Sequence, residues 1–251
     1  MMKALIAGNW KMYKSPSEAE IFAKELKNLP VYQDRDIVVC PPFLAIPAVS
    51  KVLSGTHVMI GAQNVYPAKE GAFTGEISPA MLKDAGVKFV ICGHSERRQI
   101  LKETDEFIAE KVKIVIDYGM IPILCIGETL QQNEKGETFS VVEKQLTGGL
   151  KNVSKDEMKN VVIAYEPVWA IGTGKNATPE QAQKVHSFIR ETLRKNYGDV
   201  ASEIRILYGG SVKPDNIDQL MAEQDIDGVL VGGASLKFES FSRIVDFKMN
   251  S

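Results

Sequence analysis

Residues 161–174 read Val161-Val162-Ile163-Ala164-Tyr165-Glu166-Pro167-Val168-Trp169-Ala170-Ile171-Gly172-Thr173-Gly174. The β-branched run at the start is typical of a buried strand in a parallel sheet, and Glu166 stands where that strand ends. Behind the carboxylate, Pro167 fixes φ at one end of an apolar loop, and Gly172 and Gly174 give freedom at the other. We expect a general base followed by a hinged lid that excludes water. The alternative is an acidic residue that ends a strand beside ordinary apolar packing.

The same unit of strand and helix recurs along the 251 residues. Short β-branched runs predict strands at Ala4–Gly8, Ile37–Cys40, Val58–Ala62, Phe89–Cys92, Ile121–Ile126, Val161–Tyr165, Ile204–Tyr208 and Gly228–Val231. Amphipathic segments between them predict helices such as Ser17–Leu29, Thr104–Tyr118, Thr138–Leu150 and Pro179–Asn196. Eight parallel strands alternating with helices favour an α/β fold, the closed (β/α)₈ barrel. No Gly/Ser-rich linker interrupts the pattern, so we expect residues 1–251 to form a single domain.

The helix that follows the expected lid has a clear start signal. Thr178 is a typical N-cap, Pro179 fits the first helical position, and Gln181 completes a capping box. The spacing predicts one apolar face, made of Ala182, Val185, Ile189 and Leu193.

Composition excludes several classes of partner. A hydrophobic fraction of 44%, a charged fraction of 25% and a net charge of -2 give no basic surface for nucleic acid. No apolar run is long enough for a signal peptide core or a membrane span, so we expect a cytoplasmic protein. Cys40, Cys92 and Cys125 lack the spacing of a zinc site or a disulfide framework, which favours packed thiols.

Active sites of this fold form where strands end and the following loops begin. At these positions stand Asn9 and Lys11 after the first strand, His94 after the fourth, and Glu166 after the sixth. If Ser95 begins a helical turn, its positive end keeps His94 neutral, able to donate a proton to a substrate oxygen. The Lys11 ammonium would stabilise negative charge on that oxygen. A structural histidine and a solvated lysine are the alternatives.

Two glycine pairs follow the last two strands, in Tyr208-Gly209-Gly210-Ser211-Val212 and in Leu230-Val231-Gly232-Gly233-Ala234-Ser235. Glycines let backbone N–H groups approach an anion, and a short helix starting near Gly233 would add its positive end. The pairs favour a phosphate site, although either pair alone could be a plain turn. No cluster with metal-ligand spacing stands at the strand ends, so we expect no metal.

At these residues the chain resembles the triosephosphate isomerase family. The resemblance runs from Lys3 to about Val245 and is carried by residues 7–12, 92–98, 164–174, 208–212 and 231–236. It implies an isomerase of glycolysis and gluconeogenesis that interconverts dihydroxyacetone phosphate and glyceraldehyde 3-phosphate through an enediol(ate), without a cofactor.

The resemblance also implies roles for single residues. Glu166 would move the proton between carbons, and His94 would shuttle protons between the two oxygens. Asn9 and Lys11 would contact the substrate. Family precedent places the phosphate on backbone donors at Gly172, Ser211, Gly232 and Gly233. Glu96 matches a family residue beside the lysine, and we expect it to support the residues that contact the substrate without contacting the substrate itself.

The loop at residues 63–78 is too long for an ordinary turn between strand and helix. Its segment Gly71–Glu76 resembles the loop that the family inserts into a neighbouring subunit, with Thr74 directed at the partner's Asn9 and Lys11. A homodimer is therefore implied. A mobile surface loop is less attractive, because Val65, Tyr66 and Phe73 would then expose apolar area. Tyr13 departs from the family, where many members have Asn, and we expect this to affect local packing only.

Other enzymes on a phosphate-binding barrel are the alternative function. A sugar-phosphate epimerase usually needs a His/Asp metal cluster, which the strand ends lack. A Schiff-base aldolase needs a lysine within a barrel strand, and Lys88 stands before the fourth strand, at the wrong end. A binding protein without catalysis would be indicated by the loss of Glu166, His94 or Lys11, and all three are present.

Overall fold

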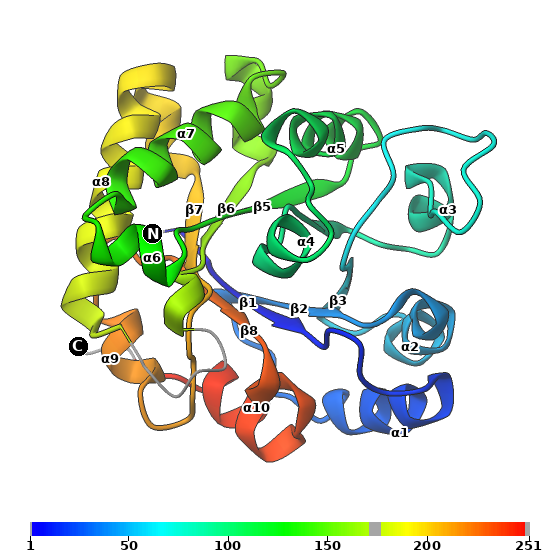
Figure 1. The fold of residues 1–251 in the computed structure, drawn as a ribbon. Helices are drawn as coiled ribbons and strands as arrows, with labels where there is room; N and C mark the ends of the chain where they lie inside the picture. Colours follow the sequence, from blue (N-terminus) through cyan, green and yellow to red (C-terminus); the bar gives the residue numbers. More distant parts are fainter. Residues whose placement is uncertain (1, 171–176, 249–251) are drawn as a thin grey trace.

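The computed structural model describes residues 2–170 and 177–248 of the chain (Figure 1). Eight parallel strands pair in sequence order and close into a barrel. They are β1 (Ala4–Asn9), β2 (Arg35–Cys40), β3 (Val58–Ala62), β4 (Phe89–Cys92), β5 (Ile121–Ile126), β6 (Val162–Tyr165), β7 (Arg205–Tyr208) and β8 (Gly228–Val231). The closing pair joins β1 to β8, with Leu5 opposite Gly228. The predicted eight-stranded barrel is confirmed.

Helices surround the barrel on its outer side (Figure 1). The α-helices are α1 (Pro16–Leu26), α2 (Ile46–Leu53), α3 (Pro79–Asp84), α4 (Ser95–Gln99), α5 (Asp105–Asp117), α6 (Leu130–Glu134), α7 (Thr138–Leu150), α8 (Pro179–Tyr197), α9 (Ile217–Met221) and α10 (Phe238–Val245). Short 3₁₀ helices are η1 (Phe43–Ala45), η2 (Lys155–Asn160), η3 (Val168–Ala170), η4 (Gly198–Glu203) and η5 (Gly233–Leu236). The four helices named from the sequence are all present, with ends shifted by up to three residues.

The start of α8 follows the sequence signal. The Thr178 hydroxyl accepts the Gln181 N–H at 3.2 Å, and the Gln181 side chain accepts the Thr178 N–H at 2.9 Å. These two bonds satisfy amide groups that the first turn of a helix leaves without intrahelical partners. The predicted apolar face of α8 is buried against the barrel.

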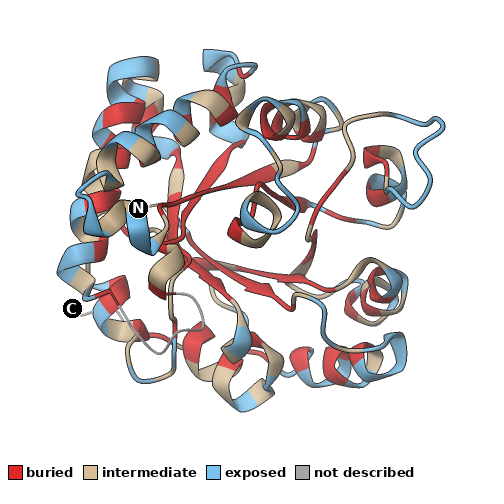
Figure 2. Ribbon diagram, viewed as in Figure 1, coloured by how far each residue is buried: buried red, intermediate tan, exposed pale blue. Residues whose placement is uncertain are grey.

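Side chains alternate between two cores along each strand, because successive residues point to opposite faces of a sheet. In β6, Val162 and Ala164 lie in the interior of the barrel, whereas Ile163 and Tyr165 belong to the core under the helices. Figure 2 shows the strands as buried and the outer faces of the helices as exposed. The alternation decides which residues at the strand ends point into the mouth of the barrel.

Candidate active site

Strand alternation carries the expected base to the mouth of the barrel. Since Val162 and Ala164 point inwards, the next inward position along β6 is Glu166, just after the strand. The same period in β1, where Leu5 and Ala7 point inwards, brings Asn9 to the same mouth. Both side chains are almost fully buried.

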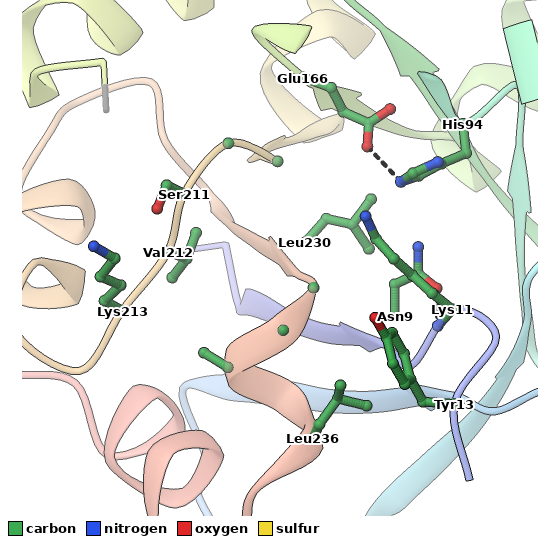
Figure 3. A pocket seen from close by; sticks show the side chains of 15 residues that line it. Asn9, Lys11, Tyr13, His94, Glu166, Ser211, Val212, Lys213, Leu230 and Leu236 are labelled. Carbon is green, nitrogen blue, oxygen red and sulfur yellow. Dashed lines mark hydrogen bonds and ion pairs between the residues drawn. The ribbon is translucent and has the colours of Figure 1, made fainter. Parts of the chain in front are cut away.

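These residues line one cavity of about 380 Å³ (Figure 3). Its lining includes seven of the residues expected from the sequence, namely Asn9, Lys11, His94, Glu166, Ser211, Gly232 and Gly233. Figure 3 shows Glu166 facing His94, Lys11 on the same side of the cavity as Asn9, and Ser211 on another. The strand ends therefore bring the expected residues together. Gly172, with the distal hinge of the expected lid, lies outside the described residues.

Glu166 and His94 form a buried pair at the inner end of this cavity. His94 Nε2 lies 2.9 Å from Glu166 Oε1, and the Ser95 N–H donates to Glu166 Oε2 at 2.9 Å. His94 is the N-cap of α4, and its Nδ1 accepts the Glu96 N–H at 3.2 Å. An Nδ1 that accepts a hydrogen bond carries no proton, so the geometry fits a neutral imidazole with its proton on Nε2.

The charge state of His94 is more complex than the sequence predicted. Burial lowers the pKa of His94, but the carboxylates of Glu166 and Glu96 raise it, and the net direction is upward. Burial raises the pKa of Glu166, whereas His94 and the Ser95 N–H lower it, with a net decrease. The prediction of a neutral His94 considered only the helix and omitted Glu166. The raised pKa depends on Glu166 remaining in contact with the imidazole.

Lys11 is held in place by a strained turn. Its φ of 52° is left-handed, which costs a residue other than glycine about 1 kcal/mol or more. Three hydrogen bonds and ion pairs hold the turn: the Lys11 N–H donates to Asn9 Oδ1 at 3.0 Å, Gln63 Nε2 donates to the Lys11 carbonyl at 2.8 Å, and Lys11 Nζ lies 2.5 Å from Glu96 Oε1. Glu96 thus contacts the ammonium and is absent from the lining of the 380 Å³ cavity.

Two glycines make room for Glu166. A Cβ on Gly127 would lie 1.8 Å from the Glu166 carbonyl oxygen, and a Cβ on Gly209 would lie 2.8 Å from Glu166 Cγ. Both distances are far below van der Waals contact, so any larger residue would displace the carboxylate. Gly209 belongs to the first of the two glycine pairs, which therefore serves the expected base as well as the expected phosphate site.

Glu128 is a buried carboxylate that sequence reasoning missed. It follows β5 and is fully buried. Its side chain accepts hydrogen bonds from Trp169 Nε1 at 2.8 Å, Tyr165 Oη at 3.1 Å and Asn133 Nδ2 at 3.1 Å. These bonds tie η3, directly after Glu166, to the loop that precedes α6. The sequence signal that could have revealed Glu128 is its position directly after Gly127, at the end of a strand.

The long loop at residues 63–78 is buried near its start and exposed at residues 71–76. Thr74 is exposed, as an intersubunit contact requires in a single chain, and the loop projects from the barrel beside α3 (Figure 1). Phe73 is 42% exposed and stacks on Tyr66, with ring centroids 4.3 Å apart. Val65 is fully buried, so the exposure of apolar area that a mobile surface loop would bring does not occur at this residue. It lies at the start of the loop and packs into the main core.

A second cavity of about 470 Å³ adjoins the first and shares Asn9, Lys11 and His94 with it. Its outer wall is apolar and includes Met12, Ile100 and Leu101, which are 94%, 72% and 57% exposed. Tyr13 lines the 380 Å³ cavity, so its departure from the family pattern reaches the site itself and not local packing alone.

Residues 2–170 and 177–248 contain no group of three or more His, Cys, Asp or Glu side chains that could hold a metal ion. Their helices include none that is long and apolar enough to cross a membrane. The three cysteines are free and buried, and burial raises the pKa of the Cys40 and Cys92 thiols to about 12.

A family model and curated relatives of this chain carry the same description. The family model described as triosephosphate isomerase matches residues 4–248. A relative named triosephosphate isomerase from Carboxydothermus hydrogenoformans is 57% identical over 247 residues, which cover 98% of each chain. Relatives of the same name from Syntrophotalea carbinolica and Clostridium botulinum are 55% and 52% identical, with coverage of 98% or more of both chains.

Proposed function

Because the chain belongs to the triosephosphate isomerase family, and so interconverts dihydroxyacetone phosphate and glyceraldehyde 3-phosphate, we propose that Glu166 is the base of this reaction. The reaction belongs to glycolysis and gluconeogenesis. The observation that carries the proposal is the buried pair in which Glu166 Oε1 lies 2.9 Å from His94 Nε2. A base and a proton donor at adjacent positions match a substrate whose acidic C–H and carbonyl oxygen are on neighbouring atoms.

The proton moves in two steps. Glu166 takes a proton from C1 of dihydroxyacetone phosphate, and the electron pair of that C–H bond forms the C1–C2 double bond as the C2 carbonyl oxygen gains charge. The electron pair of the C1–C2 double bond then takes the proton back from protonated Glu166 to form the C2–H bond, while the C1 hydroxyl loses its proton and the electron pair left on that oxygen forms the C1 carbonyl. His94 Nε2 donates to the oxygen that gains charge and recovers a proton from the other, so no proton is lost overall.

Lys11 and Asn9 stabilise the charge that develops on oxygen. The Lys11 ammonium lines the same cavity as the base, and its left-handed turn and its contact with Glu96 fix its position before substrate arrives. A fixed cation stabilises the enediolate without a cost of reorganisation during the reaction. Asn9 takes part in binding and also caps the turn.

Backbone donors at Ser211, Gly232 and Gly233 bind the substrate phosphate, together with Gly172, which lies outside the described residues. Ser211, Gly232 and Gly233 line the cavity, and the 3₁₀ helix η5 begins at Gly233. This supports the assignment, because free amide groups at the start of a helical turn favour an anion.

The protein acts as a homodimer through the loop at residues 63–78. The 470 Å³ cavity supports this, since it lies beside Lys11 and its exposed apolar wall can receive an apolar loop from a partner. Thr74 of one chain then approaches Asn9 and Lys11 of the other. We extend the proposal to one domain over residues 1–251, supported by the β1–β8 pairing, and to a cytoplasmic location, supported by three unpaired thiols.

Sedimentation across a range of concentrations tests the dimer. We expect Thr74→Arg to shift the chain towards monomer and to lower turnover, while Thr147→Arg, an exposed control on α7, leaves both unchanged. A wild-type monomer that is fully active at low concentration would contradict the role of the loop. The reaction itself is tested by a coupled assay with dihydroxyacetone phosphate, in which the absence of glyceraldehyde 3-phosphate would refute the function.

A further inference from the structure

Lys213 follows Ser211 and Val212 in the loop after β7 and lines the 380 Å³ cavity. Figure 3 shows Ser211, Val212 and Lys213 together on one side of the cavity, opposite Lys11. Asn216 fixes this loop, because its Oδ1 accepts the Lys213 N–H at 2.8 Å and its Nδ2 donates to the Ser211 carbonyl at 2.9 Å. The loop that presents Ser211 therefore also presents a lysine.

Two lysines, Lys11 and Lys213, line the cavity. Lys11 Nζ is 2.5 Å from Glu96 Oε1, so that ammonium has a carboxylate partner before the substrate arrives. Glu166 is a further negative charge. The Lys213 ammonium, by contrast, makes no hydrogen bond or ion pair with any residue in 2–170 or 177–248. Even Asp215, two residues away in the sequence, forms no ion pair with Lys213.

We infer that Lys213 is the cation that draws the phosphate dianion of the substrate to its end of the cavity and helps to retain it there. The inference rests on the proposed phosphate site at Ser211, Gly232 and Gly233. A phosphate monoester carries a charge close to −2 above its second pKa of about 6. An uncompensated charge at the mouth of a cleft raises the local concentration and the association rate of such an anion.

Four variants isolate the charge. Lys213→Gln removes it, Lys213→Arg keeps it, and Lys213→Glu reverses it. Lys195→Gln is the matched control, because it changes the net charge equally from an exposed position in the last turn of α8. Helices of this fold run back from the site, so the end of α8 lies at the opposite end of the barrel.

We expect Lys213→Gln to lower kcat/KM for dihydroxyacetone phosphate about fivefold in about 10 mM salt, because a single charge attracts a dianion through water when the two are well within the Debye length of about 30 Å. Lys213→Glu lowers it further, and Lys213→Arg restores it. The loss appears in KM and not in kcat, and the inhibition constant for inorganic phosphate rises in parallel. The loss shrinks in about 1 M salt, where the Debye length is about 3 Å.

Three results would overturn the inference. These are an unchanged kcat/KM in Lys213→Gln at low salt, an equal loss at low and high salt, or an equal loss in Lys195→Gln. An equal loss at both salt concentrations would indicate a structural role of the side chain. Failure of the proposed function is distinguishable, because the wild-type protein would then give no turnover at any salt concentration.

Discussion

Glu166→Asp tests the base assignment through distance alone, since it keeps the carboxylate and removes one methylene. Both oxygens of Glu166 are engaged, Oε1 with His94 Nε2 and Oε2 with the Ser95 N–H, each at 2.9 Å. The backbone cannot follow the shorter side chain. The Glu166 N–H donates to the Ile126 carbonyl at 2.7 Å, and Gly127 packs directly against the Glu166 carbonyl.

The carboxylate is therefore withdrawn by about 1 Å, a misplacement that costs on the order of a hundredfold in rate. This corresponds to about 2.7 kcal/mol of activation free energy. We expect kcat for dihydroxyacetone phosphate to fall by that factor while the inhibition constant for inorganic phosphate stays unchanged, because Ser211, Gly232 and Gly233 are on the loops after β7 and β8 and keep their backbone donors. The assay is steady-state turnover coupled to oxidation of glyceraldehyde 3-phosphate.

Glu191→Asp is the matched control, an identical change at an exposed position of α8. It should keep wild-type turnover. Thermal unfolding of Glu166→Asp checks that the fold persists. Near wild-type turnover in a folded Glu166→Asp protein would refute the base assignment, and a loss confined to KM would assign Glu166 to binding.

The remaining predictions concern the surroundings of the base. His94→Gln keeps a neutral donor but cannot shuttle protons, so kcat should fall strongly; an unchanged rate would remove His94 from the mechanism. Glu166→Gln removes a carboxylate that raises the pKa of His94 against the lowering effect of burial, so this pKa, measured by NMR, should fall. An unchanged pKa would show that Glu166 does not raise it. The stability contributed by the pair is fully present between the unfolded pKa values of about 4.5 and 6.5; it is lost below, as Glu166 protonates, and above, as His94 deprotonates. Denaturant titrations should therefore show the largest wild-type advantage over Glu166→Gln in that window, and an advantage independent of pH would contradict the pairing. Gly127→Ala should lower the free energy of unfolding by about 3 kcal/mol, because its Cβ meets the Glu166 carbonyl at 1.8 Å; an unchanged unfolding midpoint would show that the backbone yields.

The barrel, and the meeting of the expected residues at its mouth, were predictable because both depend on local patterns. Strand alternation and the position after each strand are readable along the chain, and they bring Glu166 and Asn9 to one mouth without knowledge of other contacts. The capping box of α8 is equally local, since Thr178 and Gln181 are three residues apart.

What the sequence did not reveal depends on segments that meet only in the fold. Glu128 binds Trp169, 41 residues away, and Gln63 binds the Lys11 carbonyl, 52 residues away. Neither partner can be read from spacing. The raised pKa of His94 has the same origin, because it reflects Glu166 on another strand end, while the sequence pointed only to the adjacent helix.

The most direct test of the central claim measures whether Glu166 transfers the proton between the two carbons. Dihydroxyacetone phosphate is incubated in D₂O, with a chelator present, with the wild-type protein, Glu166→Gln or Glu191→Gln, and the products are followed by ¹H NMR. Our account predicts glyceraldehyde 3-phosphate labelled with deuterium at C2 from the wild type and from Glu191→Gln, and almost none from Glu166→Gln. Wild-type rates in Glu166→Gln, or loss of wild-type activity with the chelator, would contradict it.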